Sequence, residues 1–346
     1  MDSKFSVKKL VVYHDCIDGA ASAWAFRQKW GDDPKTDYVS YSHDKAAESE
    51  EKILSTLESG TLLYFADVAP TPAFLEILLS PASGLAAVAI IDHHKSAAGN
   101  LQGYIPSVFE GFAPPRLDIR IEKDNPSASG MVWRELFPDR TPPDFLKMIE
   151  KMDRSGLASR EDYAAAALID SKPIRSPEEA FKTCDALSLM TYDEMVREGE
   201  PIFTDQERRI AKLADAVMYA KFEPFPGSPP FLVPVINANV RDFGRYITKF
   251  LQDLGEEAGS GVAFAWHETK EGSVVMSIRS LDGLDTSTVA KYFCSEKEGI
   301  TGGGHGNMAA VTFPSYEVFE KKVLKNVVEK GSVPAPRAKK PPAQSL

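Results

Sequence analysis

Hydrophobic and polar positions along the first half of the chain predict strands and helices that take turns. Short apolar runs typical of buried strands are KKLVVYH, TLLYFAD and LAAVAIIDHH. Between them, apolar residues recur at helical spacing in DGAASAWAFRQKW and PTPAFLEILLS. Strands that alternate with helices pack as a parallel sheet covered on both faces. The pattern therefore predicts an α/β fold for this half of the chain.

The pattern becomes helical from about residue 125 to residue 220. Four segments there have a 3.6-residue period: SGMVWRELF, PDFLKMIEKMD, SPEEAFKTCDALSLM and YDEMVREGEPIFTDQERRIAKLADAVMYA. The following residues 221–234 contain five prolines and a glycine, which predict a linker. We therefore expect a first domain over residues 1–220, made of a parallel sheet and a helical extension.

A second, smaller α/β domain is expected over residues 235–330. Its predicted elements are the strands VPVINA, GVAFAWH and SVVMSIRS, a helix at RDFGRYITKFLQDLGE, a loop at TGGGHGNMAA and a closing helix at YEVFEKKVLKNVVEK. Residues 331–346 are rich in proline, alanine and lysine and predict a disordered tail.

Composition limits the kinds of partner. The 346 residues are 43% hydrophobic and carry a formal net charge of -10, which argues against a broad basic surface for long nucleic acid. The cysteines Cys16, Cys184 and Cys294 form no C-x-x-C pair, so neither a disulfide framework nor a thiolate zinc site is expected. No apolar run approaches the roughly 20 residues that cross a membrane, and the N-terminus lacks the apolar core of a secretory signal. We expect a cytoplasmic protein with no membrane partner.

Side chains that bind metals gather at the predicted carboxyl ends of the strands: His14, Asp18, Asp67, Asp92, His93 and His94. Ligands of open α/β sheets bind at this edge. Mn²⁺ and Mg²⁺ accept carboxylate oxygen and imidazole nitrogen, and a pair of such ions can assist phosphoryl transfer. The strand ends therefore indicate a metal site.

Five motifs in order give the chain a resemblance to a known family. They are YHDCIDGAASA, FADVAP, IIDHHKSA, MIEKMDRSG and TGGGHGNMAA. Each motif alone is a weak signal, but the ordered set, from about Lys8 to Phe313, resembles the DHH/DHHA1 phosphoesterase superfamily. With MSIRSLDGLDTSTVAKYF ahead of the glycine segment, it is most similar to the oligoribonuclease or cyclic-nucleotide phosphodiesterase branch. The resemblance implies a DHH domain, a DHHA1 domain and an active site in the cleft between them.

The resemblance also implies roles for single residues. The implied metal ligands are His14, Cys16, Asp18, Asp67, His93 and Asp153, and the implied cofactor is Mn²⁺, as two ions, with Mg²⁺ as an alternative. Asp67 would bridge both ions. Asp92 would orient its neighbours, and His94 would face the substrate phosphate.

Cys16 departs from the common family pattern H-x-D-x-D, because it stands where a carboxylate ligand of the first metal is expected. Three alternatives stay open at this point. Cys16 could coordinate as a thiolate and favour a softer metal, Asp15 could take its place, or the first metal site could be weak.

The glycine segment predicts an anion site in the second domain. Gly302, Gly303 and Gly304 allow close approach to backbone amides beside His305, and the resemblance adds Arg279 as a phosphate ligand. A plain turn between helix and strand is the alternative for this segment.

Ordinary structural roles compete with the proposed ones. Asp18 could be the N-cap of its helix, and Asp153 could cap a helix end. His43 and His267 belong to no motif, so we assign them no function. Three aromatic residues at helical spacing predict core packing: Trp24, Trp133 and Phe137.

The function expected from these observations is metal-dependent hydrolysis of short oligoribonucleotides to mononucleotides by activated water. Hydrolysis of 3'-phosphoadenosine 5'-phosphate, of linear dinucleotides or of cyclic nucleotides is one alternative. Others are polyphosphate or pyrophosphate hydrolysis, and a non-catalytic nucleotide-binding protein whose first metal site has degenerated at Cys16. The expected partner is a short nucleotide rather than long nucleic acid. A homodimer stays open, since the sequence carries no sign of oligomeric state.

Overall fold

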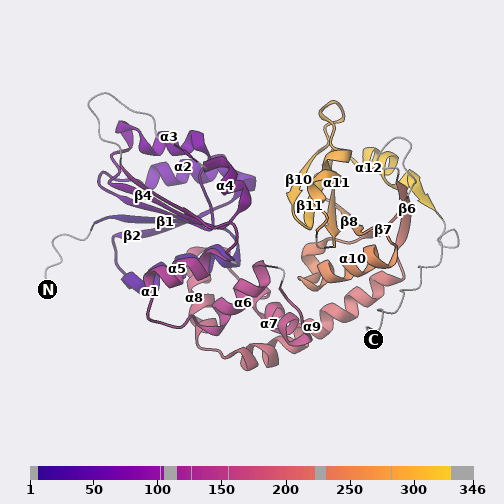
Figure 1. Cartoon of the computed structure of the whole chain (residues 1–346), viewed down its shortest axis with the longest axis horizontal. Helices are drawn as coiled ribbons and strands as arrows, with labels where there is room; N and C mark the ends of the chain where they lie inside the picture. Colours follow the sequence, from indigo (N-terminus) through magenta and orange to yellow (C-terminus); the bar gives the residue numbers. More distant parts are fainter. Residues whose placement is uncertain are drawn as a thin grey trace, which may run out of the picture. The chain divides into compact units, whose positions relative to one another are not determined.

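The computed structural model describes residues 7–101, 103–104, 115–125, 127–154, 156–222, 231–281 and 283–328. The chain divides into two compact units, Met1–Pro201 and Ile202–Leu346. Figure 1 shows the elements of each unit. The two units are described separately below.

The first unit contains a five-stranded parallel sheet in the order β2-β1-β3-β4-β5. Its strands are β1 Lys9–His14, β2 Thr36–Tyr41, β3 Leu62–Ala66, β4 Ala87–Asp92 and β5 Arg116–Ile121. The structure confirms the three apolar strands predicted from the sequence, which form the centre of the sheet. The edge strands β2 and β5 were not predicted, because TDYVSY and RLDIRI are half polar and only partly buried.

Helices cover both faces of this sheet, as Figure 1 shows, with α2, α3 and α4 on one side and α1, α5 and α8 on the other. Their bounds are α1 Ile17–Trp30, α2 Ala46–Thr56, α3 Pro72–Leu79, α4 Lys95–Leu101, α5 Ala128–Leu136, α6 Asp144–Asp153, α7 Arg160–Asp170, α8 Pro177–Ser188 and α9 Tyr192–Ala214. The short 3-10 turns are η2 His43–Lys45 and η3 Pro81–Ser83.

The aromatic residues predicted for the core lie there. Trp24 of α1 stacks on Trp133 of α5 with ring centroids 5.7 Å apart, and both indoles are buried. Phe137 packs on Trp133 with centroids 4.5 Å apart and is also buried. These contacts hold the helical extension against α1, the helix that begins at the carboxyl end of β1.

The second unit contains a seven-stranded sheet in the order β10-β11-β9-β8-β7-β6-β12. Its elements are β6 Met218–Phe222, β7 Phe231–Asn237, η4 Val240–Phe243, α10 Tyr246–Glu257, β8 Val262–Glu268, β9 Val274–Ser280, α11 Thr286–Phe293, η5 Glu296–Glu298, β10 Thr301–His305, β11 Met308–Phe313, α12 Tyr316–Lys322, η6 Leu324–Asn326 and β12 Val327–Val328. Apart from the parallel pair β7 and β8, neighbouring strands run antiparallel. A smaller α/β unit at this end of the chain agrees with the prediction.

The structure differs from the sequence prediction at the start of this unit. The long helix expected up to Ala220 ends at Ala214, and the division between units falls inside it, at Pro201. The segment expected as a linker begins and ends in paired strands, since Phe222 of β6 lies opposite Phe231 of β7. Residues 223–230 and the expected tail at 331–346 lie outside the described part of the chain. Strand pairing on either side of these residues was not predicted, because a local pattern does not show which distant strand pairs with it.

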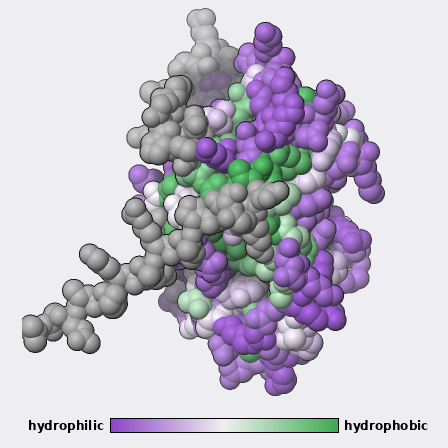
Figure 2. All heavy atoms as spheres, turned by 90° about the vertical axis from the view of Figure 1, so that its right-hand side faces the viewer, coloured by the Kyte–Doolittle hydropathy of each residue, from purple (hydrophilic) through white to green (hydrophobic). Residues whose placement is uncertain are grey.

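Apolar side chains reach the surface of the second unit beside α11. A cavity of about 610 Å³ is lined mainly by such residues, including Phe222, Phe231, Phe264, Tyr292 and Phe293. Figure 2 shows a band of apolar side chains bordered by polar ones on the face that it presents. Within the described ranges, no helix has the length and apolar character to cross a membrane.

Candidate metal centre

The carboxyl ends of three neighbouring strands bring the predicted ligands together. His14 ends β1, Asp67 follows β3, and Asp92 ends β4, with His93 and His94 directly after it. The ligand atoms form three overlapping groups in which all atoms lie within 4.8 Å of one another: Asp67, Asp92, His93 and His94; His14, Cys16 and Asp67; Asp18, His93 and Asp153. The six side chains expected at the strand ends, together with Cys16 and Asp153, are therefore neighbours in the folded unit.

Gly19 allows α1 to start against the end of β1. A Cβ atom at this position would lie 2.1 Å from the carbonyl oxygen of His14, a distance at which no side chain fits. This close approach places Cys16 and Asp18, on either side of Ile17, next to His14.

Asp67 lies at the centre of the cluster. Its Oδ2 accepts the thiol hydrogen bond of Cys16 at 2.9 Å and lies 3.7 Å from Nδ1 of His14. Its Oδ1 lies 3.3 Å from Nε2 of His93 and 3.9 Å from Nδ1 of His94. The two oxygens of one carboxylate thus face two different groups of ligands, which is the arrangement of a bridging carboxylate.

The backbone of Asp67 is unusual. With φ at 63°, it is the one non-glycine residue in the left-handed region among the described residues. Its amide donates to the carbonyl oxygen of Ile91 at 3.0 Å, which ties the turn to β4. Aspartate tolerates this conformation better than most residues, but the conformation still costs free energy and is typical of functional positions.

Three buried polar atoms of the cluster have no hydrogen-bond partner in the described part of the chain: Nδ1 of His14, Oδ1 of Asp67 and Nε2 of His93. Buried polar atoms are nearly always paired, because an unpaired one loses its hydration without compensation. Imidazole nitrogen and carboxylate oxygen are ligands of hard and borderline divalent cations. The donor set therefore fits divalent cations, with Asp67 shared between the two groups.

Asp18 connects the centre to α5. Its Oδ2 accepts from the amide of Ala128 at 2.8 Å and its Oδ1 from the amide of Ser129 at 3.0 Å. Burial, together with the charges of Asp67 and Asp153, raises the pKa of Asp18 to about 7 despite these hydrogen bonds. A bound cation would restore the ionised form.

Cys16, not Asp18, is the N-cap of α1, so the alternative role considered for Asp18 does not apply. The Cys16 sulfur accepts from the amide of Gly19 at 3.3 Å. Burial and the neighbouring carboxylates of Asp67 and Asp18 raise the pKa of the thiol well above its usual value. The thiol is therefore protonated at neutral pH unless a bound cation displaces its proton.

His93 lies among three carboxylates of the cluster. Burial lowers the pKa of His93, but Asp67, Asp18 and Asp153 outweigh it and raise the pKa to about 9. Asp153, the last residue of α6, has Oδ2 3.4 Å from Nε2 of His93. Its side chain thus faces the cluster.

Asp92 orients the residues that follow it. Its Oδ1 accepts from the amides of His93 and His94, at 2.7 and 3.1 Å, and lies 2.7 Å from Nδ1 of His94. This pairing places the His94 proton on Nδ1 and leaves Nε2 free as an acceptor or ligand. Asp92 therefore acts on the centre through the two histidines.

The glycine segment in the second unit is a strand, not the predicted loop. Gly302, Gly303 and Gly304 belong to β10, which pairs antiparallel with β11. A Cβ atom on Gly304 would lie 2.4 Å from Cα of Ala309, whereas a Cβ atom on Gly303 would meet nothing within 4 Å. Glycine at 304 is thus required by close strand packing, while Gly303 leaves its backbone open. The side chain of His305 lies outside the described part.

Arg279 lies on β9, two strands from the glycine strand, and Met308 of β11 is its partner in the register. Its guanidinium donates to Oγ1 of Thr248 at 3.4 Å and to the carbonyl oxygen of Ile278 at 2.9 Å. Burial lowers the pKa of this group, and within the described residues no carboxylate pairs with it. A partly buried guanidinium whose contacts are neutral suits an anionic ligand.

His43 belongs to this edge of the first unit although it was given no function from the sequence. Its ring centroid lies 5.2 Å from that of His14. The signal that would have found it is its place two residues after the end of β2, the strand beside β1. Because β2 was not predicted, His43 could not be placed there.

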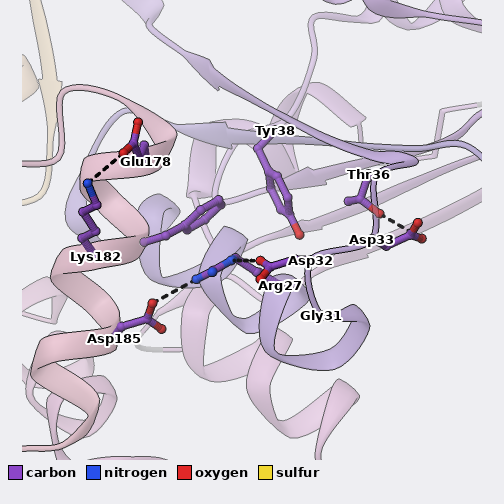
Figure 3. A pocket seen from close by; sticks show the side chains of 10 residues that line it. Arg27, Gly31, Asp32, Asp33, Thr36, Tyr38, Glu178, Lys182 and Asp185 are labelled. Carbon is purple, nitrogen blue, oxygen red and sulfur yellow. Dashed lines mark hydrogen bonds and ion pairs between the residues drawn. The ribbon is translucent and has the colours of Figure 1, made fainter.

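A polar cavity of about 420 Å³ lies at the other end of β2, near its first residue Thr36, and is shown in Figure 3. Its charged groups pair with one another. Arg27 donates to Asp32 at 2.9 Å and to Asp185 at 3.0 Å. The other dashed lines in the figure mark the ion pair of Lys182 with Glu178 and the hydrogen bond of Thr36 to Asp33. The contact of Arg27 with Asp185 ties α1 to α8. The hydroxyl of Tyr38, which also lines this cavity, is buried and has no hydrogen-bond partner in the described part of the chain.

Comparisons with known proteins concern the second unit and the fold. Residues 229–330 match the family model of the DHHA1 domain. The fold is similar to that of the DHH domain of a member of the S1p family of ribosomal proteins, with a TM-score of 0.50 and 14% identity over 92% of this chain and 85% of that chain. A search of curated protein sequences gave no match.

Two further solved structures are similar. One is the pGpG-specific phosphodiesterase PggH from Vibrio cholerae, with a TM-score of 0.48 and 13% identity over 92% of this chain and 96% of that chain. The other is RecJ from Thermus thermophilus in complex with Mn²⁺, with a TM-score of 0.48 and 14% identity over 91% of this chain and 50% of that chain. This chain thus spans half the length of that RecJ.

The second unit therefore carries a DHHA1 domain on a two-unit α/β architecture of DHH type. Outside residues 229–330, the likeness to the DHH-domain structure is a likeness of fold.

Proposed function

We propose that this protein is a metal-dependent phosphoesterase that hydrolyses the phosphodiester bonds of short oligoribonucleotides to mononucleotides. The observation that carries the proposal is Asp67, whose two carboxylate oxygens face separate groups of ligand atoms, with unpaired buried atoms in both groups. The match of residues 229–330 to the DHHA1 domain, together with the resemblance of the sequence motifs to the DHH/DHHA1 phosphoesterases, supports phosphoester hydrolysis as the reaction class.

The residues that would hold two divalent cations follow from the groups of ligand atoms. His14, Cys16 and Asp67 would hold one, and Asp18, His93 and Asp153, together with Asp67, would hold the other. We propose Mn²⁺ as the ion, with Mg²⁺ as an alternative, because carboxylate and imidazole ligands suit both. When bound, such ions activate water and neutralise charge on the phosphate oxygens.

The chain's own residues would orient the substrate. Asp92 fixes the ring of His94 by the hydrogen bond to Nδ1, so that Nε2 can face a phosphate oxygen. Arg279 in the DHHA1 domain would pair with a substrate phosphate, since its present contacts are with neutral groups.

A short substrate is favoured by charge. The net charge of -10 does not support binding along a long polyanion, whose affinity depends on many basic contacts. A few phosphates held by cations and one arginine suit a short oligonucleotide better.

The test is Mn²⁺-dependent release of mononucleotides from a 5'-phosphorylated RNA trinucleotide, followed by chromatography, with Asp67→Ala protein as the control. Turnover by the intact protein that disappears in the variant would support the proposal. The same assay with 3'-phosphoadenosine 5'-phosphate, a cyclic dinucleotide and pyrophosphate would distinguish the alternative substrates. Absence of turnover on all four, with nucleotide binding retained, would favour a non-catalytic binding protein instead.

A further inference from the structure

The position of His43 is fixed relative to the metal centre by the pairing of β1 and β2. His14 and Tyr41 are partners in the parallel register. One residue later, the amide of Asp15 donates to the carbonyl oxygen of Tyr41 at 3.0 Å, so the two segments remain paired beyond the end of β1. His43 therefore follows at the same edge of the sheet as His14, on the neighbouring chain segment.

The imidazole of His43 is held by ring contacts alone in the described part of the chain. Its centroid lies 5.2 Å from that of His14, at an interplanar angle of 46°, and 5.5 Å from that of Tyr41, at 77°. The residue is exposed, in contrast to Asp67. Its ring is thus oriented by two aromatic neighbours, while its nitrogen atoms have no hydrogen bond to a described residue.

His43 differs from the neighbouring histidines in what it can do. His14 and His94 each lie near carboxylates of the cluster, Asp67 and Asp92 respectively. His43 is not a member of any of the three groups of ligand atoms. An imidazole beside a metal ligand, outside the ligand groups and open on its outer side, is suited to contact a molecule bound at the centre.

We propose that His43 is a substrate-binding residue of this centre, and that its imidazole N–H donates a hydrogen bond to a phosphate oxygen of the nucleotide on the His14 side. The inference rests on the proposed function for the identity of the ligand. It adds a contact from the segment that follows β2, whose residues are absent from the five sequence motifs. A neutral imidazole suffices, because it always carries one N–H donor.

The first experiment compares His43→Ala, His43→Gln and His267→Ala with the unchanged protein. His267, on β8 in the second unit, is the matched control, because it also belongs to no motif. In the trinucleotide assay with Mn²⁺, we expect His43→Ala to raise KM roughly tenfold with a smaller change in kcat, as loss of one hydrogen bond to a charged group implies. His43→Gln, which keeps an N–H donor, should recover most of the loss.

Two further measurements separate this role from others. Binding of Mn²⁺ without nucleotide, followed by electron paramagnetic resonance, should be unchanged in His43→Ala, whereas a roughly tenfold weaker Mn²⁺ affinity would overturn the proposal by making His43 a metal ligand. Thermal unfolding should also be unchanged, since the side chain is exposed. A lower unfolding temperature in both His43 variants, with no change in KM, would mean that the ring contacts are merely structural.

The experiment also distinguishes failure of this inference from failure of the proposed function. Binding of AMP to the Mn²⁺-loaded protein, measured by calorimetry, needs no turnover. If the intact protein hydrolyses no substrate but binds AMP roughly tenfold more tightly than His43→Ala, the proposed hydrolysis fails and the His43 contact stands. If AMP affinity and KM are the same in both proteins, the His43 contact is wrong whatever the activity.

Discussion

The thiol of Cys16 donates a hydrogen bond to Oδ2 of Asp67 at 2.9 Å, across 51 positions of the sequence. The same sulfur accepts from the amide of Gly19 and so caps α1. Cys16 therefore hydrogen-bonds to one oxygen of the carboxylate that faces both ligand groups. This relationship makes Cys16 a structural residue and a candidate ligand at the same position.

Substitutions at Cys16 should separate these two roles. Cys16→Ser keeps an acceptor for the Gly19 amide and should be more stable than Cys16→Ala by about 1 kcal/mol, the usual contribution of an N-cap. Chemical denaturation in the presence of a chelator measures this difference. Equal stability of the two variants would show that the sulfur does not cap α1 in solution.

Cys16→Asp belongs to the same series and tests the metal site. It restores the carboxylate of the common family pattern and should bind Mn²⁺ more tightly than the unchanged protein in calorimetry. If this variant gains activity from near zero, the natural first site is degenerate. If the unchanged protein is already active and Cys16→Asp adds nothing, the cysteine is a competent natural variant.

Asp67→Asn should remove the metal centre without unfolding the protein. Asparagine has the shape of aspartate and accepts the backbone conformation with φ at 63°, but its amide carries no charge to hold two cations. We expect an unfolding midpoint within a few degrees of the original and a loss of phosphoesterase activity of about 100-fold or more. Asp67→Val is the contrasting variant, since a β-branched residue disfavours this conformation and should also lower stability. Full activity in Asp67→Asn would contradict the bridging role.

The metal-free protein should lose stability as pH rises from neutral to alkaline. The folded pKa of His93, about 9, lies above its ordinary value of 6.5, so its contribution is complete below pH 6.5 and is lost as pH rises through 9. Asp18, raised from 3.8 to about 7, also binds its proton more tightly when folded, and its contribution is lost as pH rises through 7. Thermal unfolding with a chelator should therefore give a lower midpoint at about pH 9 than at about pH 6.

The control for this pH effect is His93→Gln, which should flatten the decline above about pH 7. Saturating Mg²⁺ should reduce the decline in the unchanged protein, because cations replace the protons that the cluster binds. A midpoint that rises over the same pH range in the chelated protein would contradict the raised pKa values.

Two neighbouring glycines offer a matched test of the DHHA1 strand. Gly304→Ala places a methyl group 2.4 Å from Cα of Ala309 and from the carbonyl oxygen of Met308, so the β10–β11 pairing must shift. We expect a destabilisation of about 3 kcal/mol, in the range of overpacking in a filled space. Gly303→Ala meets nothing within 4 Å and should change the free energy of unfolding by less than about 0.5 kcal/mol. Denaturant unfolding measures the free energy of unfolding of both variants. Similar free energies for the two would show that these residues do not form the described strand in solution.

The core of the first unit could be predicted because buried parallel strands are nearly continuous apolar runs. The segments that became β1, β3 and β4 have this character, and polar residues directly after them marked the edge where ligands gather. The edge strand β2 has a mixed pattern, since one of its sides is open. Because this strand was not predicted, the position of His43 after it could not be predicted either. Gly302, Gly303 and Gly304 suggested a loop, because local propensity carries no information about the close partner strand β11.

By itself, the sequence determined which residue types stand at the strand ends, and therefore that carboxylates and imidazoles would meet there. Only the tertiary structure decided how they meet. The carboxylate of Asp18 accepts a hydrogen bond from the amide of Ala128, 110 positions further along the chain. The carboxylate of Asp67, whose backbone is left-handed, faces two ligand groups. These relationships join segments far apart in sequence, and the packing of α1 against β1 and α5 places them within hydrogen-bonding distance. Periodicity records which face of an element is buried, but not which distant group lies against it.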